Sequence, residues 1–575
     1  MINLVRETMK EFPWIKSYPA GVRWDAELPT MPVPALLEDA AAKWPEHPAL
    51  DFMGKKTSYR ELQALVDRAA KGFQQLGVKP GVHVGLYLPN TPHYIISFFG
   101  ILKAGGTVVN YSPLDAEKVL EHKIEDSETD MLVTLDLVVL YPQMAKFLGH
   151  TRLKKLIIGS IAEMSPYPDA VRAGLEKANQ LSAIPANDSH VPFQQLLDND
   201  GKYTPVPAGD PKETIAVLQY TGGTTGLPKG AMLTHGNLTT ACSQILETLN
   251  VQPQILHEGE ERLLAVLPLF HIYALTVDML FGLRMGAEIF LHTRFDVDAV
   301  VKDLAAKKIT VFPGVPTMYT AIINHPEIRS FDLSSLKFCN SGGAPLPAEV
   351  LQQFQTLTGC TLLEGWGMTE TSPTGTFTPL GGIRKSGSCG LPTPGITFKF
   401  ASVDDARQYV GLGERGEICV AGGNIMKGYW KKPEATADVM TADGFLRTGD
   451  VGYMDEDGFV YIVDRTKDMI LCGGYNVYPR NIEEAIYEHP AVAEVSVIGV
   501  PDAYRGQSPK AFIKLKAGAA GITLDEMKDF LKSRLGKHEM LQEMEIRAEL
   551  PKTPVGKLSK KELYEEEARK RAAAA

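Results

Sequence analysis

The residues best suited to chemistry lie in a glycine-rich stretch at residues 219–237. An apolar run at 215–218 precedes it and predicts a buried strand. The candidate loop then supplies Thr221, Gly222, Gly223, Thr224, Thr225, Gly226 and Lys229. Glycine lets successive backbone N–H groups turn toward an anion, while the threonine hydroxyls and the lysine ammonium add donors and positive charge. The pattern favours polyphosphate binding over a flexible linker.

The Walker A phosphate loop is excluded, although it shares this composition. That motif ends in Gly-Lys-Ser/Thr at the start of a helix. Here Pro228 precedes Lys229 and Gly230 follows it, so we expect no helix to begin at the lysine.

Two polar stretches suit a nucleotide base and its phosphates, although each also has a simpler structural interpretation. Residues 341–345 place two glycines after a predicted strand, either for close approach of a flat ligand or for a tight turn. Residues 364–371 place Trp366 between two glycines, where it could stack on a base. The following Thr369 and Glu370 could serve phosphate and Mg²⁺, or could simply cap a helix.

Three further stretches could bind a ribose, form a hinge and bring a mobile lysine into an active site, respectively. Asp450, after a glycine turn, could bind a diol or its own backbone. The charged residues 464–468 mark either a hinge or a solvated linker. Lys557, on a loop shaped by proline and glycine, could enter an active site or remain an ordinary exposed lysine. Together the stretches favour a nucleoside triphosphate as ligand.

Alternating helix and strand patterns predict the framework that positions these residues. Apolar residues at helical spacing predict a helix at 59–77. Strands at 82–88, 107–110 and 131–134 alternate with helices at 93–103 and 115–126, and the alternation resumes over 263–357. This order predicts an α/β fold of mostly parallel sheets covered by helices.

A change of pattern in the last third of the sequence predicts a second domain. From about residue 387, short alternating strands and turns indicate a small antiparallel, β-barrel-like part. A smaller α+β pattern follows Asp464 and Arg465. We therefore expect a large N-terminal domain over 1–464, with the ATP and acid sites, and a small mobile C-terminal domain over 465–575.

Composition excludes several classes of function. The chain has 575 residues, too many for one core, and 59 Lys and Arg against 69 Asp and Glu give a net charge of −10. A nucleic-acid partner is therefore not expected. The six cysteines lack zinc or iron–sulfur spacing, which is typical of a reducing cytosol.

The sequence also predicts a cytoplasmic location. No signal peptide is visible, and the longest uncharged apolar run, 263–277, is too short to span a bilayer. The aromatic residues Phe12, Trp14 and Tyr18 are expected to pack on the domain rather than to touch a membrane. A peripheral contact with the inner membrane and a homodimer stay open.

Five motifs resemble, in order and spacing, those of the adenylate-forming superfamily of acyl-CoA synthetases, luciferases and peptide-synthetase adenylation domains. They are YTGGTTGLPKG at 220–230, GWGMTE at 365–370, TGD at 448–450, Asp464 and Arg465 with Lys467, and PVGK at 554–557. The Thr-Gly-Gly loop and PLFHIYA at 268–274 are most similar to bacterial long-chain fatty-acid–CoA ligases.

The resemblance implies two half-reactions, with Mg²⁺ as cofactor and ATP and CoA as co-substrates. A carboxylate attacks the α-phosphorus of ATP, and after rotation of the small domain the CoA thiol displaces AMP. The implied catalytic residues are Lys557, Thr369, Glu370 and His271, with Lys467 at the hinge, Gly473 and Gly474 at the CoA site, and Thr225 and Glu370 at the metal. Beyond the loop, the implied ATP and AMP contacts are Gly342, Gly343, Ala344, Glu364, Gly365, Trp366, Gly367, Met368, Asp450, Ile462 and Arg465.

Two departures from the family pattern are visible. Tyrosine is common where Trp366 stands, and a tryptophan should still stack on adenine. Some members have a lysine for the thioester step where this chain has Leu471, so that contact is not expected here.

The resemblance also bears on the acid substrate. Gly367 stands where acetyl-CoA synthetases carry a tryptophan that closes the acyl pocket, so an open pocket is expected beside His271. His271 could instead be a core histidine bonded to the backbone. A medium- or long-chain fatty acid is our first expectation and a benzoate- or cinnamate-type aryl acid the second. Loading of a carrier protein and a luciferase-type oxygenation are weaker alternatives, and no carrier domain is visible.

Overall fold

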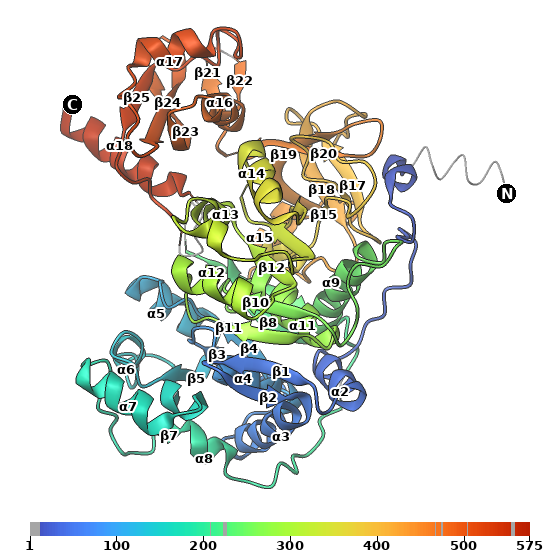
Figure 1. Cartoon of the computed structure of the whole chain (residues 1–575), viewed down its shortest axis with the longest axis vertical. Helices are drawn as coiled ribbons and strands as arrows, with labels where there is room; N and C mark the ends of the chain where they lie inside the picture. The colour runs from blue at the N-terminus through green and yellow to red at the C-terminus, as the bar shows by residue number, and fades with distance from the viewer. Residues whose placement is uncertain are drawn as a thin grey trace, which may run out of the picture.

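The computed structural model describes residues 12–207, 209–221, 227–344, 346–465, 467–472, 475–502, 504–553 and 558–574. Within these residues the chain forms two seven-stranded sheets, a smaller antiparallel part and a C-terminal α+β unit. Figure 1 shows the C-terminal unit, in orange and red, at the opposite end of the molecule from helices α7 (Pro168–Lys177) and α8 (Phe193–Leu197).

One seven-stranded sheet carries the candidate phosphate loop, in the order β7-β6-β5-β3-β4-β8-β9. Its strands are β3 (His83–Leu86), β4 (Thr107–Asn110), β5 (Thr129–Leu135), β6 (Lys155–Gly159), β7 (His190–Pro192), β8 (Ile215–Thr221) and β9 (Lys229–Thr234). Neighbouring strands are parallel except β8 and β9, which form an antiparallel hairpin. The helices along this part of the chain are α4 (Pro92–Lys103), α5 (Glu117–Asp126), α6 (Tyr141–Ala145), η2 (Ile161–Met164), α7, α8 and α9 (His235–Thr248).

The other seven-stranded sheet has the order β14-β13-β12-β10-β11-β1-β2 and is parallel except for the β1–β2 pair. Its strands are β1 (Pro48–Phe52), β2 (Lys55–Ser58), β10 (Arg262–Ala265), β11 (Glu288–Leu291), β12 (Val311–Gly314), β13 (Phe338–Ser341) and β14 (Leu362–Glu364). Its helices are η1 (Pro13–Ser17), α2 (Pro34–Lys43), α3 (Tyr59–Gln75), α10 (Ile272–Ala274), η3 (Leu275–Leu280), α11 (Phe281–Arg284), α12 (Val297–Ala306), α13 (Pro316–Ile323), η4 (Ile328–Ser330) and α14 (Ala348–Thr358).

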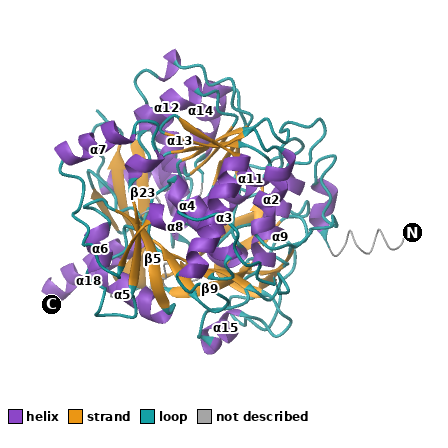
Figure 2. Cartoon of the chain, turned by 90° about the horizontal axis from the view of Figure 1, so that it is seen from below, coloured by secondary structure: helices purple, strands orange, loops and turns teal. Residues whose placement is uncertain are grey.

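Helices α3, α4 and α8 lie between the strands of the two sheets (Figure 2). All twelve residues of α4 are buried, as expected for a helix that is covered on every side. Helix α3 begins at a capping box between Ser58 and Glu61, and its apolar face is buried. The predicted α/β fold is therefore confirmed. No helix in the described part of the chain is long and apolar enough to cross a bilayer.

The antiparallel part consists of a four-stranded sheet, β17-β18-β19-β20, and a ribbon of β15 and β16. Its elements are η5 (Thr369–Thr371), β15 (Thr376–Phe377), β16 (Leu391–Pro392), β17 (Thr397–Ala401), β18 (Gly416–Ala421), α15 (Pro433–Val439), β19 (Leu446–Met454) and β20 (Val460–Arg465). A single bridge between Gly390 and Val460 joins the ribbon to β20. The part expected to resemble a barrel is this sheet together with its ribbon.

The C-terminal unit has its own sheet, β22-β21-β24-β23, with β25 added on β24. Its elements are β21 (Ile470–Cys472), β22 (Tyr475–Val477), α16 (Pro479–Tyr487), β23 (Val492–Asp502), β24 (Gly506–Leu515), α17 (Leu524–Leu531), β25 (Glu543–Ile546) and α18 (Lys560–Ala574). Its main core cluster begins at Ile470, whereas the large core of the preceding part reaches Val460. The expected boundary after residue 464 falls at the end of β20.

The N-terminal aromatic residues pack against the protein. Trp14 is buried, and the Phe12 ring stacks on Trp24 with 4.4 Å between ring centroids. The Tyr18 hydroxyl donates to the carbonyl of Pro392 at 2.5 Å. These contacts confirm the expectation that the segment is held on the domain.

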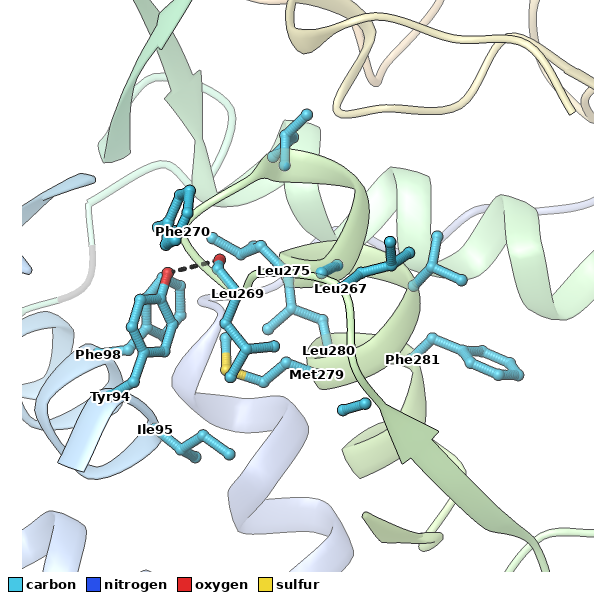
Figure 3. Packing of buried hydrophobic residues seen from close by; sticks show 14 of the residues in the cluster. Tyr94, Ile95, Phe98, Leu267, Leu269, Phe270, Leu275, Met279, Leu280 and Phe281 are labelled. Carbon is cyan, nitrogen blue, oxygen red and sulfur yellow. Dashed lines mark hydrogen bonds between the residues drawn. The ribbon is translucent and has the colours of Figure 1, made fainter. Parts of the chain in front are cut away.

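The segment at 267–281 packs on α4 and contains a π-helical turn (Figure 3). The Tyr94 hydroxyl donates to the Leu269 carbonyl at 2.8 Å and fixes the chain just before His271. The turn, η3, lies between the short α-helical segments α10 and α11 and so interrupts one of the helices expected within 263–357. Such turns are rare and occur frequently at functional sites.

Asp278, within η3, is a fully buried carboxyl with no hydrogen-bond partner among the described residues. Burial raises its pKa well above the usual value. Above pH 4 the unfolded chain therefore holds fewer protons than the folded one, and stability falls as pH rises toward the folded-state pKa. Asp278→Asn should remove this loss, which is about 1.4 kcal/mol per pH unit in that window.

Thermal unfolding of both proteins between pH 4.5 and 8 measures this effect. We expect Asp278→Asn to raise Tm at neutral pH, with a gain that shrinks as pH falls. An equal gain at every pH would contradict the linkage to Asp278 ionisation.

Candidate functional site

The candidate phosphate loop joins the two strands of the β8–β9 hairpin. Thr221 and Lys229 face each other in register across that hairpin. The chain continues from Lys229 as a strand, which confirms that no Walker-type helix begins there. Residues 222–226 lie outside the described part of the chain, so the roles of Gly222, Gly223, Thr224, Thr225 and Gly226 stay predictions.

A buried chain of amide groups ties this hairpin to the segment that carries His271. The Asn110 side chain donates to Gln219 at 2.8 Å, and the Gln219 side chain donates to the Phe270 carbonyl at 2.9 Å. The adjacent His271 is partly exposed, and its Nδ1 accepts the Tyr273 N–H at 3.3 Å. The two regions of the predicted site therefore share one rigid support.

The two predicted base-binding stretches lie side by side at the carboxyl ends of β13 and β14. Ser341 pairs with Glu364 in register, and the Gly365 N–H donates to the Ser341 carbonyl at 3.3 Å. This contact brings Gly342, Gly343 and Ala344 next to the turn that holds Trp366. Gly342 must lack a Cβ here, because one would lie 2.9 Å from the Tyr273 ring.

Trp366 contacts Asp450, the residue predicted to bind the ribose, directly. Its indole N–H donates to Asp450 Oδ2 at 2.8 Å, and Arg465 Nε lies 3.3 Å from Asp450 Oδ1. Asp450 and Arg465 are also register partners on β19 and β20. Ile462 lies on β20 opposite Gly452. The structure thus brings the residues predicted for adenine and ribose into one cluster.

We expect Trp366→Phe to raise KM for ATP about tenfold, because the ring remains while a hydrogen bond to a carboxylate is lost. The value of kcat should change little, since no group at the reacting phosphorus is altered. ATP saturation curves measure both quantities. Trp24→Phe is the matched control, because its indole N–H donates to a backbone carbonyl, that of Ile396, at 3.0 Å. An unchanged KM for ATP in Trp366→Phe would show that Trp366 does not take part in ATP binding.

Glu370, the predicted metal ligand, is joined to Lys229 through Tyr429. The Tyr429 hydroxyl donates to Glu370 Oε1 at 2.8 Å, and Lys229 Nζ lies 5.1 Å from the centre of the Tyr429 ring. Burial raises the pKa of Glu370, and the bond from Tyr429 opposes this shift. Thr369 and Glu370 form the turn η5, which begins after Met368. Sequence reasoning missed Tyr429, whose only signal is an aromatic pair after Gly428.

The expected open pocket at Gly367 is not what the structure places there. A Cβ at Gly367 would lie 1.4 Å from the carbonyl oxygen of Pro373. Glycine is therefore required by the close approach of backbone, and its missing side chain does not leave room for an acid. The inference of an open acyl pocket from Gly367 is therefore wrong.

The boundary between the large part and the C-terminal unit is held by buried charged groups. Asp464 accepts the N–H groups of Arg465 at 2.7 Å and Arg480 at 2.9 Å, and burial raises its pKa to about 6. Burial also raises the pKa of Glu364 to about 7, against the opposing charge of Arg480. Burial, with the nearby Arg465, lowers the pKa of Lys467. Arg480 was not predicted, because it lies at the start of α16 outside every polar stretch.

Three predicted residues of the C-terminal unit cannot be placed. Lys557, Gly473 and Gly474 lie outside the described residues. The described ends of the Lys557 loop are close together, because Lys552 and Leu558 form an antiparallel bridge.

Comparisons with known proteins agree with this geometry. A family model described as AMP-binding enzyme matches residues 37–430, and one described as AMP-binding enzyme C-terminal domain matches 481–557. The chain is 40% identical over 560 residues to a long-chain-fatty-acid–CoA ligase of Bacillus subtilis, covering 96% of this chain and 98% of that protein. It is 36% identical over 562 residues to the enzyme of the same name from Salmonella typhimurium, with the same coverage. A solved anthranilate CoA ligase in complex with anthranoyl-AMP is 25% identical and has a TM-score of 0.83, covering 96% of this chain and 99% of that one.

Proposed function

The chain belongs to the AMP-binding enzyme family, and we propose that it is a fatty-acid–CoA ligase. It converts ATP, a medium- or long-chain fatty acid and CoA into acyl-CoA, AMP and diphosphate. The observation that carries the proposal is the cluster of Trp366, Asp450 and Arg465, a nucleoside site next to the Glu370 carboxylate. The two fatty-acid–CoA ligases, which are similar over nearly the whole chain, support the choice of acid.

In the first half-reaction a carboxylate oxygen of the acid bonds to the α-phosphorus of ATP. The bond from that phosphorus to the bridging oxygen breaks, and diphosphate leaves. Lys229 and the loop at 222–226 hold the departing phosphates, while Trp366 and Asp450 fix the nucleoside. Negative charge builds on phosphate oxygens, and the role proposed for the Lys557 ammonium is to stabilise it.

In the second half-reaction the CoA sulfur bonds to the acyl carbonyl carbon. The bond from that carbon to the AMP oxygen breaks, and the thiol proton is released. The segment with Gly473 and Gly474 carries the pantetheine arm in this step. We assign His271 to the place where the acyl and CoA channels would meet.

The donor set fits Mg²⁺, which supplies charge neutralisation on the phosphates when bound. Glu370 offers a buried carboxylate with one oxygen already oriented by Tyr429. Within the described ranges, no group of three or more His, Cys, Asp or Glu could hold a metal alone. An ion bound by one carboxylate and substrate phosphates is the usual arrangement for Mg²⁺. Thr225 is its second proposed protein ligand.

Rotation of a domain over 465–575 against one over 1–464 separates the two steps. Separate main cores on the two sides support this division, and the described contacts across the boundary are a small apolar cluster of Val451, Val463 and Tyr478 together with polar contacts. Lys516 Nζ lies 3.6 Å from Glu349, and Arg480 opposes Glu364. Lys467 lies at the hinge. Interfaces between domains of one chain that have a limited apolar part resemble transient interfaces, which suits a unit that must move.

The test of the function is AMP release with Mg-ATP and CoA over a panel of fatty, aryl and dicarboxylic acids. We expect the highest kcat/KM with medium- or long-chain fatty acids, and loss of activity in Glu370→Gln, which ties the reaction to this site. Preference for benzoates or cinnamates would establish the aryl-acid alternative. Activity that needs a carrier protein in place of CoA would establish an acyl-AMP loading enzyme.

Location and assembly complete the proposal. We place the protein in the cytoplasm, with peripheral contact at the inner membrane as the route to a membrane-derived acid. Co-sedimentation with vesicles of inner-membrane lipids tests that contact, and light scattering tests a homodimer.

A further inference from the structure

Tyr429 stands between a cation and an anion that the proposed reaction needs separately. Its hydroxyl donates to Glu370 Oε1 at 2.8 Å, while its ring faces Lys229 Nζ at 5.1 Å from the ring centre. Within the described residues, neither Lys229 nor Glu370 takes part in an ion pair. One aromatic side chain therefore satisfies both charges, one at its polar tip and one at its face.

The backbone around Tyr429 is fixed on both sides of the site. Ala231 and Tyr429 form an antiparallel bridge, so the segment extends the β8–β9 hairpin that carries Lys229. The Tyr429 N–H donates to Thr436 Oγ1 at 2.9 Å. The Met426 N–H donates to the Glu370 carbonyl at 2.8 Å, which holds η5 against the same segment. Tyr429 is thus a rigid spacer between the hairpin and η5.

A second tyrosine, on the surface, makes the same two contacts, but there the lysine and the carboxylate also contact each other. The Tyr409 hydroxyl donates to Asp443 at 2.7 Å, and Lys399 Nζ lies 4.6 Å from its ring centre. There Lys399 also pairs directly with Asp443 at 2.6 Å. A lysine and a carboxylate that share one tyrosine therefore do form an ion pair when the geometry permits. At Tyr429 the described residues form no such pair, although the lysine and the carboxylate contact the same side chain.

We propose that Tyr429 is a positioning residue that keeps the Glu370 carboxylate and the Lys229 ammonium apart. The inference deepens the proposed function and rests on it. If the two groups paired with each other, the carboxylate would be taken from the metal and the ammonium from the triphosphate. The spacer leaves the carboxylate aimed at the cation of Mg-ATP and the ammonium aimed at its phosphates.

The test compares nucleotide affinity with and without magnesium, using a fluorescent ATP analogue and no acid. In Tyr429→Phe the ring stays and the hydrogen bond is lost, so affinity for Mg-nucleotide should fall about tenfold while affinity in EDTA stays within about twofold. In Tyr429→Leu the ring is lost as well, and affinity in EDTA should also fall by about two- to fivefold. Tyr409→Phe is the matched control and should equal wild type in both conditions.

A double-mutant cycle with Glu370→Gln distinguishes an effect of Tyr429 that acts through Glu370 from a general loss of stability. If Tyr429 acts through Glu370, adding Tyr429→Phe to Glu370→Gln should cause no further loss of Mg-nucleotide affinity. Equal losses with and without magnesium, or full additivity in the cycle, would overturn the inference. Because binding needs no acid, failure to form any acyl-CoA would refute the proposed function without deciding the role of Tyr429.

Discussion

Replacing Lys557 with alanine should lower adenylate formation by about 100- to 1,000-fold, the usual cost of losing one charge-stabilising donor in a reacting site. Thioester formation from supplied acyl-adenylate should stay within a few-fold of wild type. The reason is that phosphorus is attacked only in the first half-reaction, whereas in the second the CoA sulfur attacks the acyl carbon and AMP leaves without any attack at phosphorus. Diphosphate exchange with ATP measures the first step, and acyl-CoA formation from synthetic acyl-adenylate measures the second.

The segment around Lys557 allows a close control. The loop is pinned at its ends, because Lys552 and Leu558 are bridged and the Ser559 N–H donates to the Pro551 carbonyl at 2.9 Å. Lys561, a few residues further on, is exposed, and its ion pair with Glu565 is long, at 4.0 Å. Lys561→Ala should therefore leave both steps unchanged. Equal loss of both steps in Lys557→Ala would show that the lysine serves the fold of the loop rather than the adenylation step.

The framework could be predicted because its signals are local. Helix α3 follows the N-cap Ser58 with a capping box, and α4 is a mostly apolar run, so spacing and composition identify both. The β-α alternation then requires parallel sheets. The π-helical turn η3 was not predictable, because a wider turn leaves the apolar pattern of the segment nearly unchanged.

The candidate site also has residues that the sequence predicted and residues that it did not. Trp366, Asp450 and Arg465 were identified from short motifs, and the structure joins them by two direct contacts. Tyr429 carries no such motif, and its role depends on a strand pairing with residues about two hundred positions earlier in the chain. Arg480 likewise matters only because α16 packs near Glu364. Contacts made across such sequence distances are set by tertiary packing, which residue spacing does not encode.

At Gly367 the expectation from the sequence and the structure disagree most. Its substitution is the second change for which we expect a large loss of activity. We expect Gly367→Ala to lower kcat/KM for ATP by about 100-fold or more, equally for every acid. A Cβ there would lie 1.4 Å from the Pro373 carbonyl oxygen, so the turn must move by more than an ångström. That turn positions Trp366 on one side and Glu370 on the other, and displacement on this scale costs about two orders of magnitude in rate.

Gly365→Ala is the matched control, because it flanks Trp366 on the other side. Its Cβ would lie 3.2 Å from the Thr376 carbonyl oxygen, which a small shift can accommodate, so the loss should stay below about tenfold. Both variants are assayed with fatty acids of increasing length. If Gly367→Ala instead kept its activity on short acids and lost only long ones, the residue would border the acyl pocket after all. A uniform loss means that this glycine is selected by the backbone of the nucleotide site, and that the length of the acid is decided elsewhere in the fold.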